Sequence, residues 1–192
     1  MDNNYIFQYW EAIQNGTVTV GKWIKTIYEI LVNGLKSGKW DFDEEKANKA
    51  INFIENFCHH SEGRNDLLKL ELWQKAIVSA IFGIMDKRTG YRQFREVFIV
   101  VARKNGKTLF AAAIAAYMAY IDGEYGAKVY FLAPKLDQAD LVYDAFYQIV
   151  QADDELDSIT KKRRSDIYIK EFNTSVKKIA FNSKKSDGFN PQ

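Results

Sequence analysis

Residues 97–116 constrain the fold of this chain most, because a strand, a turn and a helix are encoded there in direct succession. Val97 to Val101 is apolar and mostly β-branched, which predicts a strand buried on both faces. A polar turn follows, and an alanine-rich run from Leu109 to Ala116 predicts a buried helix. A helix that starts in this way has free backbone N–H groups in its first turn, which attract an anion together with the helix dipole. This order of elements predicts a phosphate-binding loop.

The end of the turn carries the side chains that a nucleoside triphosphate requires. Lys107 can reach the β- and γ-phosphates, and the hydroxyl of Thr108 is placed to bind Mg²⁺. The pattern departs from the standard motif at one position, since its first glycine falls on Val101. The alternative is an ordinary helix start with a solvated lysine. The strand and helix on either side favour the binding of a nucleoside triphosphate together with Mg²⁺.

Other residues of the turn complete the predicted site. The backbone N–H groups of Asn105, Gly106 and Lys107 are expected to surround the phosphates, and Lys107 and Arg103 are the candidate catalytic residues. Arg103 has two interpretations, contact with the γ-phosphate or a salt bridge within the loop, and the sequence does not decide between them.

A second candidate binding element is the pair Trp73 and Gln74, at the start of a predicted helix over residues 70–85. An aromatic ring beside an amide that both donates and accepts is suited to an adenine edge. The alternative for Trp73 is packing in the core.

The rest of the chain predicts an α/β fold of the P-loop type, with a parallel sheet and flanking helices, preceded by a helical segment. Helical periodicity covers residues 5–14, 20–36 and about 41–60, and the polar break that follows predicts a boundary between an N-terminal segment, 1–62, and a nucleotide-binding core, 63–192. Within the core, residues 127–133 predict a strand and 138–150 a helix, which implies a parallel sheet. Two short strands around Ile167 and Val176, joined at residues 173–175, predict a hairpin.

Charge is distributed unevenly, although the formal net charge is only +2. Residues 1–160 carry a net charge of −4, whereas residues 161–192 carry +6. The basic runs 161–164, 177–178 and 184–185 suit contacts to a nucleic-acid backbone or, equally, a solvated strand edge or turn. No signal peptide and no apolar run of about 18 residues is present, which predicts a soluble cytoplasmic protein.

Several stretches together resemble the large terminase subunit of tailed bacteriophages. Leu72-Trp73-Gln74, where Trp73 and Gln74 would bind the nucleotide, is similar to the family's adenine-side glutamine motif, and residues 101–108 are similar to its divergent Walker A. The other two stretches are Val129 to Pro134 with Gln138-Ala139, and Ser186 to Pro191. In the Walker A stretch, the residues that would bind the nucleotide are Arg103, Lys104, Asn105, Gly106, Lys107 and Thr108. The segment from Gly16 to Glu55 also resembles what precedes the core in this family. The missing first glycine agrees with the family pattern.

The resemblance implies an ATPase that drives double-stranded DNA into the procapsid of a phage, in the cytoplasm of the bacterial host. It implies ATP and Mg²⁺ as cofactors, a portal protein and a small terminase subunit as partners, a ring oligomer in the motor, and no membrane contact. Residues 135–192 offer no apolar strand ending in Asp-Glu, the expected Walker B, and the family's nuclease domain has no counterpart here. We therefore expect the chain to be an N-terminal part of the enzyme that binds nucleotide without turnover.

Two other functions fit the same residues. One is a different P-loop class, such as a helicase-like protein or a small-molecule kinase. The other is a non-catalytic interaction module that docks through the N-terminal helices and has a vestigial nucleotide site.

Overall fold

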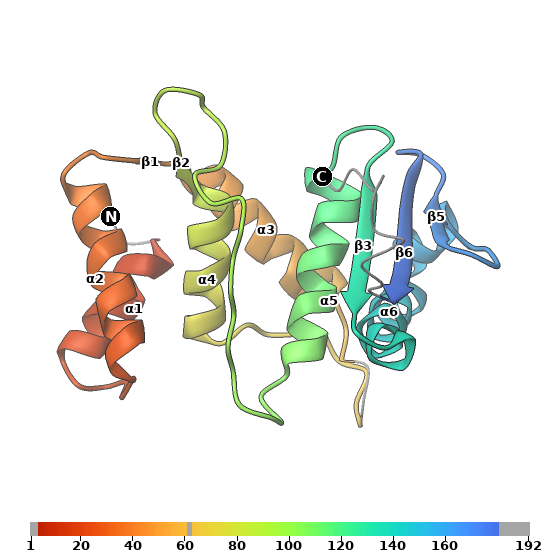
Figure 1. Cartoon of the computed structure of the whole chain (residues 1–192), viewed down its shortest axis with the longest axis horizontal. Coiled ribbons are helices and arrows are strands. Elements are labelled where there is room, and N and C mark those ends of the chain that lie inside the picture. The colour runs from red at the N-terminus through yellow and green to blue at the C-terminus, as the bar shows by residue number, and fades with distance from the viewer. Residues whose placement is uncertain (1–3, 61–62, 181–192) are drawn as a thin grey trace. The chain divides into compact units, whose positions relative to one another are not determined.

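A computed structural model describes residues 4–60 and 63–180 of the chain (Figure 1). The chain forms two compact units. The first comprises residues 1–52 and 69–100, and the second comprises residues 53–68 and 101–192. The predicted functional boundary at residues 62 and 63 stays a prediction, because residues 61 and 62 lie outside the described part. The basic run 184–185 and the family-like stretch 186–191 also lie outside it.

The first unit is built on three helices, α1 (Tyr5–Gln14), α2 (Lys22–Lys36) and α4 (Leu72–Gly83). Helix α1 packs against both of the others. It starts at Asn4, whose side chain accepts a hydrogen bond of 2.9 Å from the N–H of Ile6, the usual role of an N-cap asparagine. The apolar residues of the three helices and the adjoining strand form one cluster: Ile6, Tyr9, Ile13, Tyr28, Leu31, Val32, Ala76 and Ile84. The predicted helices 5–14 and 20–36 are confirmed.

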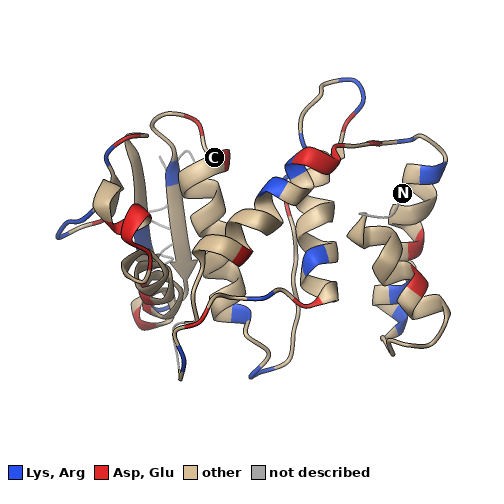
Figure 2. Cartoon of the chain, turned by 180° about the vertical axis from the view of Figure 1, so that it is seen from behind, with Lys and Arg blue, Asp and Glu red and all other residues tan. Residues whose placement is uncertain are grey.

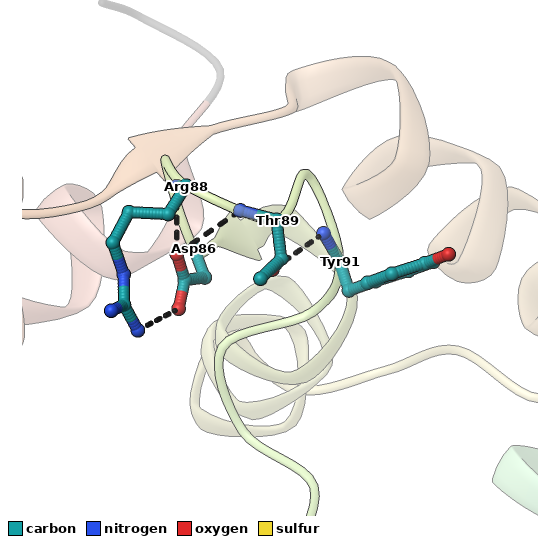
Figure 3. Close-up of polar contacts among 4 residues, drawn as sticks. All are labelled: Asp86, Arg88, Thr89 and Tyr91. Atoms are coloured by element: carbon teal, nitrogen blue, oxygen red, sulfur yellow. Dashed lines mark hydrogen bonds and ion pairs between the residues drawn. The ribbon is translucent and has the colours of Figure 1, made fainter.

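Short antiparallel strands complete this unit. Strand β1 (Asp41–Phe42) pairs with β2 (Ile84–Met85), and the start of α3 (Glu44–Phe57) follows β1. Beyond β2 the chain makes a tight turn in which Asp86 accepts hydrogen bonds from the N–H groups of Arg88 and Thr89 (Figure 3). Periodicity could not predict β1 and β2, because two residues are too few to show it.

The second unit holds α5 (Lys107–Tyr117), which continues into a π-helical turn η1 (Met118–Asp122). Its other elements are β3 (Lys128–Ala133), α6 (Leu136–Gln151), α7 (Asp154–Ile159), β4 (Thr160–Lys162), β5 (Ile167–Ile169) and β6 (Thr174–Ala180). The predicted strand at 127–133, helix at 138–150 and C-terminal hairpin are confirmed as β3, α6 and the β5–β6 pair. The polar α7 and the short β4 were not predicted.

The sheet of this unit has the order β3-β6-β5-β4. Strands β3 and β6 run parallel, as predicted for the strand-helix-strand order, and the β6–β5 and β5–β4 pairs are antiparallel, so the sheet is mixed. The cause is the tight turns that join β4 to β5 and β5 to β6, because a short loop returns the chain in the opposite direction.

The core of the second unit lies between α5, α6 and the sheet. Alanines on α5 allow it to pack closely against α6. The fully buried Phe146 of α6 is surrounded by the rings of Tyr120 and Phe131, with centroids 6.3 and 6.0 Å away. The hydroxyl of Tyr120 shares a 2.6 Å hydrogen bond with that of Thr160, and burial raises the pKa of Tyr120. These contacts anchor η1, which continues α5, against α6 and the start of β4.

One prediction on residues 97–101 is wrong in this structure. The segment forms no strand, and Phe98 and Val100 are 91% and 95% exposed instead of buried. A strand requires a neighbour that satisfies its backbone N–H and C=O groups. Among the described strands none pairs with this segment, so its β-branched composition alone does not make it a strand.

No helix within residues 4–60 and 63–180 combines the length and the apolar character needed to cross a membrane.

Candidate nucleotide-binding loop

The loop before α5 has an unusual backbone conformation at two positions. Lys104 and Gly106 both adopt left-handed conformations, with φ of 66° and 67°, and Asn105 between them does not. A Cβ atom on Gly106 would meet nothing within 4 Å, so glycine is favoured there by the backbone conformation and not by lack of space. A non-glycine residue in this conformation costs about 1–2 kcal/mol, so Lys104 adds strain to the loop.

The first turn of α5 is open to an anion. Gly106 is the N-cap of α5, no side chain caps the helix, and no acidic residue lies in its first turn. The first intrahelical bond runs from the N–H of Phe110 to the carbonyl oxygen of Gly106, at 2.9 Å. The N–H groups of the residues between them therefore have no intrahelical acceptor. A left-handed residue directly ahead of a helix start directs successive N–H groups toward one side, which is the arrangement found in concave anion-binding turns.

The side chain of Lys107 folds back over the loop. Its Nζ donates to the carbonyl oxygens of Val101, at 2.7 Å, and Ala102, at 3.1 Å. The amide of Asn105 donates to the carbonyl oxygens of Ala102 and Arg103, both at 3.2 Å. The two side chains thus hold the loop closed from within, and the ammonium group stays beside the helix start.

The guanidinium group of Arg103 and the hydroxyl of Thr108 are exposed. In the described part of the chain, neither makes a hydrogen bond or an ion pair, so the alternative of a salt bridge by Arg103 within the loop is not formed. Arg103, Lys104 and Lys107 place three positive charges in the loop, and no Asp or Glu occurs from residue 97 to 121. Figure 2 shows blue on the turn that leads into α5. The loop is therefore electrostatically suited to a polyanion.

A divalent cation would need more than this loop. Thr108 offers one oxygen, and within residues 4–60 and 63–180 no group of three His, Cys, Asp or Glu residues could hold a metal ion. Mg²⁺ typically binds through one or two protein oxygens together with substrate phosphates and water. The residues present fit Mg²⁺ only as a partner of a bound nucleotide.

The predicted adenine-side residues lie in the first unit, on the first turn of α4. Gln74 is only 8% exposed, and its Oε1 accepts a 2.9 Å hydrogen bond from the N–H of Glu71. The side chain of Glu71 accepts in return from the N–H of Gln74, which makes a capping box. Trp73 packs partly buried against the core of this unit. Gln74 thus has a structural role, and its contact with adenine stays a prediction.

Sequence reasoning did not anticipate two features of the loop. The left-handed Lys104 has no signal in the sequence, since lysine has no preference for that conformation. The hydrogen bonds of Lys107 to carbonyl oxygens were also not predicted, because the motif describes the lysine with its ligand present.

The mixed sheet, the alanine-rich helix and the loop before it are consistent with a P-loop NTPase fold. Residues 72–192 match the family described as the terminase large subunit, ATPase domain. This match covers more than half of the chain, and the chain belongs to that family.

A solved structure supports the fold. The crystal structure of the HK97 bacteriophage large terminase is similar to this chain with a TM-score of 0.64 and 24% sequence identity, over 76% of this chain. The matched region spans 29% of the length of that terminase. Among curated proteins, no match was found.

Proposed function

We propose that this chain binds MgATP through the loop at residues 103–108 and is the nucleotide-binding part of a phage DNA-packaging ATPase. The observation that carries the proposal is the loop itself: an uncapped helix start, preceded by left-handed residues and surrounded by three cations. Membership of the terminase family supports ATP as the ligand.

Each residue of the loop has a role in this proposal. Lys107 leaves the carbonyl oxygens of Val101 and Ala102 and binds the β- and γ-phosphates, while the N–H groups of Asn105, Gly106 and Lys107 surround them. The guanidinium group of Arg103, which makes no hydrogen bond or ion pair among the described residues, contacts the γ-phosphate. Thr108 supplies the protein oxygen for Mg²⁺, which neutralises phosphate charge when it is bound.

For the complete protein, we propose ATP hydrolysis coupled to the movement of double-stranded DNA into a procapsid, in the cytoplasm of the host cell. The partners would be the DNA, a portal protein and a small terminase subunit, with several copies in a ring. This part of the proposal depends on the family and not on the geometry of the loop.

Titration with a fluorescent ATP analogue tests the binding of nucleotide. We expect Mg²⁺-dependent binding by the parent chain, and a loss of at least about tenfold in Lys107→Ala, since a hydrogen bond to a charged group is worth about 1.5–3 kcal/mol. Lys135→Ala is the matched control, because Lys135 lies in the same unit, outside the loop, and its side chain makes no capping hydrogen bond to α6. Equal affinities of the parent and Lys107→Ala would contradict the proposal.

A further inference from the structure

The two faces of the sheet in the second unit differ in chemistry. Phe131 lies against the rings of Tyr143 and Phe146, and Lys178 forms an ion pair with Asp140, so these two strand residues point toward α6. Side chains alternate along a strand. The neighbouring strand residues therefore lie on the opposite face, away from α6.

The register of the strands shows which residues share that opposite face. Lys161, Tyr168, Ser175 and Lys128 form one row across all four strands, and Lys177 lies opposite Tyr130 in a second row. Lys128 and Lys161 are exposed, and Lys177 is partly exposed. We refer to Lys128, Lys161 and Lys177 as the lysine row.

The charges of the lysine row have no acidic partner among residues 4–60 and 63–180. The other strand residues of this face are Tyr130, Leu132, Tyr168, Ser175 and Ile179, none of which is acidic. In the described part of the chain, no member of the lysine row forms an ion pair, in contrast to Lys178 on the other face. Figure 2 shows blue on the loop joining β4 to β5, which contains Arg163 and Arg164, and of these two Arg163 is paired with Asp166.

Tyr168, which lies between Lys161 and Ser175 in the first of these rows, already contacts a cationic side chain. The guanidinium carbon of Arg163 lies 3.6 Å from the ring centroid of Tyr168, and Nε of Arg163 lies 3.3 Å from Oδ1 of Asp166. On the ring face that Arg163 covers, a base would have to displace Arg163 in order to stack on Tyr168. Single-stranded nucleic acids are held largely by stacking on free aromatic rings. At Tyr168 the face is therefore better suited to a phosphate backbone than to unpaired bases.

The spacing of the row agrees with a duplex. Lys161 and Lys128 are separated by three strand spacings of about 4.8 Å, or roughly 14 Å. The major groove of B-DNA is about 12 Å wide, so two flexible lysines at this spacing reach phosphates on both of its edges. We propose that the lysine row binds the phosphate backbone of double-stranded DNA. The choice of duplex DNA as the partner rests on the proposed function.

The test is a DNA-binding titration of the full chain with a fluorescent 30-base-pair duplex, followed by anisotropy over a series of salt concentrations. The test variant is the triple substitution Lys128→Gln, Lys161→Gln and Lys177→Gln. The matched control is Lys22→Gln, Lys25→Gln and Lys49→Gln, three exposed lysines of the first unit with the same change in net charge. Melting temperatures show whether each variant is folded.

We expect the triple variant to bind the duplex at least about tenfold more weakly at low salt. The slope of log affinity against log salt should become shallower by about 2–3, since each lost phosphate contact contributes about 0.9. The affinity of the control variant for the duplex should change less than about twofold, because its three lysines are expected to contact no phosphate. Equal losses in the two triple variants, absence of duplex binding by the parent, or tighter binding of a single strand would overturn the proposal.

Titration of the same samples with the ATP analogue separates this proposal from the proposed function. The triple variant should bind nucleotide like the parent, because none of its substitutions lies in the loop. Loss of DNA binding with nucleotide binding intact supports the lysine row. Failure of the parent to bind nucleotide would contradict the proposed function. The DNA affinities of the two triple variants would still decide whether the lysine row binds DNA.

Discussion

The Nζ atom of Lys107 lies 2.7 Å from the carbonyl oxygen of Val101, so the first residue of α5 is tied to the segment that enters the loop. A phosphate that binds Lys107 must compete with this carbonyl and with that of Ala102. The lysine therefore contributes to the structure of the loop before a ligand binds.

The first prediction concerns the stability of the ligand-free chain. Lys107→Ala should lower the free energy of unfolding by about 1 kcal/mol, because it removes two hydrogen bonds from a charged donor in an exposed position. Urea unfolding measures this change. Lys135→Ala, a lysine whose side chain makes no such contacts, should stay within about 0.5 kcal/mol of the parent. Identical curves for the two variants would show that the contacts of Lys107 contribute nothing.

The second prediction separates the two roles of Gln74. Gln74→Ala removes one half of the capping box and should cost about 1 kcal/mol of stability. Gln74→Glu keeps an acceptor for the N–H of Glu71 and should be destabilised less, but it loses the amide donor. If Gln74 also binds adenine, the Gln74→Glu variant should bind ATP more weakly than the parent and should bind inorganic triphosphate with unchanged affinity. Equal affinities of Gln74→Glu and the parent for ATP would limit Gln74 to the helix cap.

Long elements with strong periodicity were predictable from the sequence. Helices α1 and α6 each bury one apolar stripe, and the helical spacing of that stripe is visible in the order of the residues alone. The helix start at Lys107 was predictable for a different reason, because glycine, lysine and threonine in this order follow from the chemistry of phosphate binding.

The remaining features depend on contacts that a local pattern does not record. The segment from Val97 to Val101 has the composition of a buried strand, yet strand formation requires a partner from elsewhere in the chain. On α2 the pattern predicted an apolar face, but Trp23, Ile27 and Ile30 are 74%, 49% and 54% exposed. Periodicity shows which residues share a face, and not whether another element covers it.

The third prediction concerns the left-handed residues of the loop. Lys104→Gly relieves the strained conformation, but it also increases the freedom of the unfolded chain, so its net effect should be within about 1 kcal/mol of zero. Gly106→Ala introduces the same strain that Lys104 carries and should be destabilised by about 1 kcal/mol or more. Thermal unfolding of both variants measures the difference. Lys104→Ala is the control, because it keeps a Cβ atom in the left-handed conformation and should resemble the parent. A destabilisation of Lys104→Gly as large as that of Gly106→Ala would contradict this account.

The last prediction concerns the turn at Asp86 (Figure 3), where the carboxylate accepts from the N–H of Arg88 at 2.7 Å and from that of Thr89 at 3.3 Å. The backbone N–H of Arg88 is the main cause of a lowered pKa of Asp86, and the guanidinium group of Arg88 adds to it. A carboxyl whose pKa is lower in the folded state stabilises that state above its ordinary pKa of 3.8, and the contribution is lost as the pH falls through the lowered value.

Asp86→Asn tests this directly, because asparagine keeps an acceptor oxygen but has no charge to titrate. The difference in unfolding free energy between the parent and Asp86→Asn should be constant near neutral pH and should decrease below about pH 4, since the parent alone then loses its carboxylate. Urea unfolding between pH 7 and pH 2 measures it. Arg88→Ala should keep most of this pH dependence, because it removes the guanidinium group and leaves the backbone N–H in place. A difference between the parent and Asp86→Asn that does not change with pH would show that the charge of Asp86 has no part in the turn.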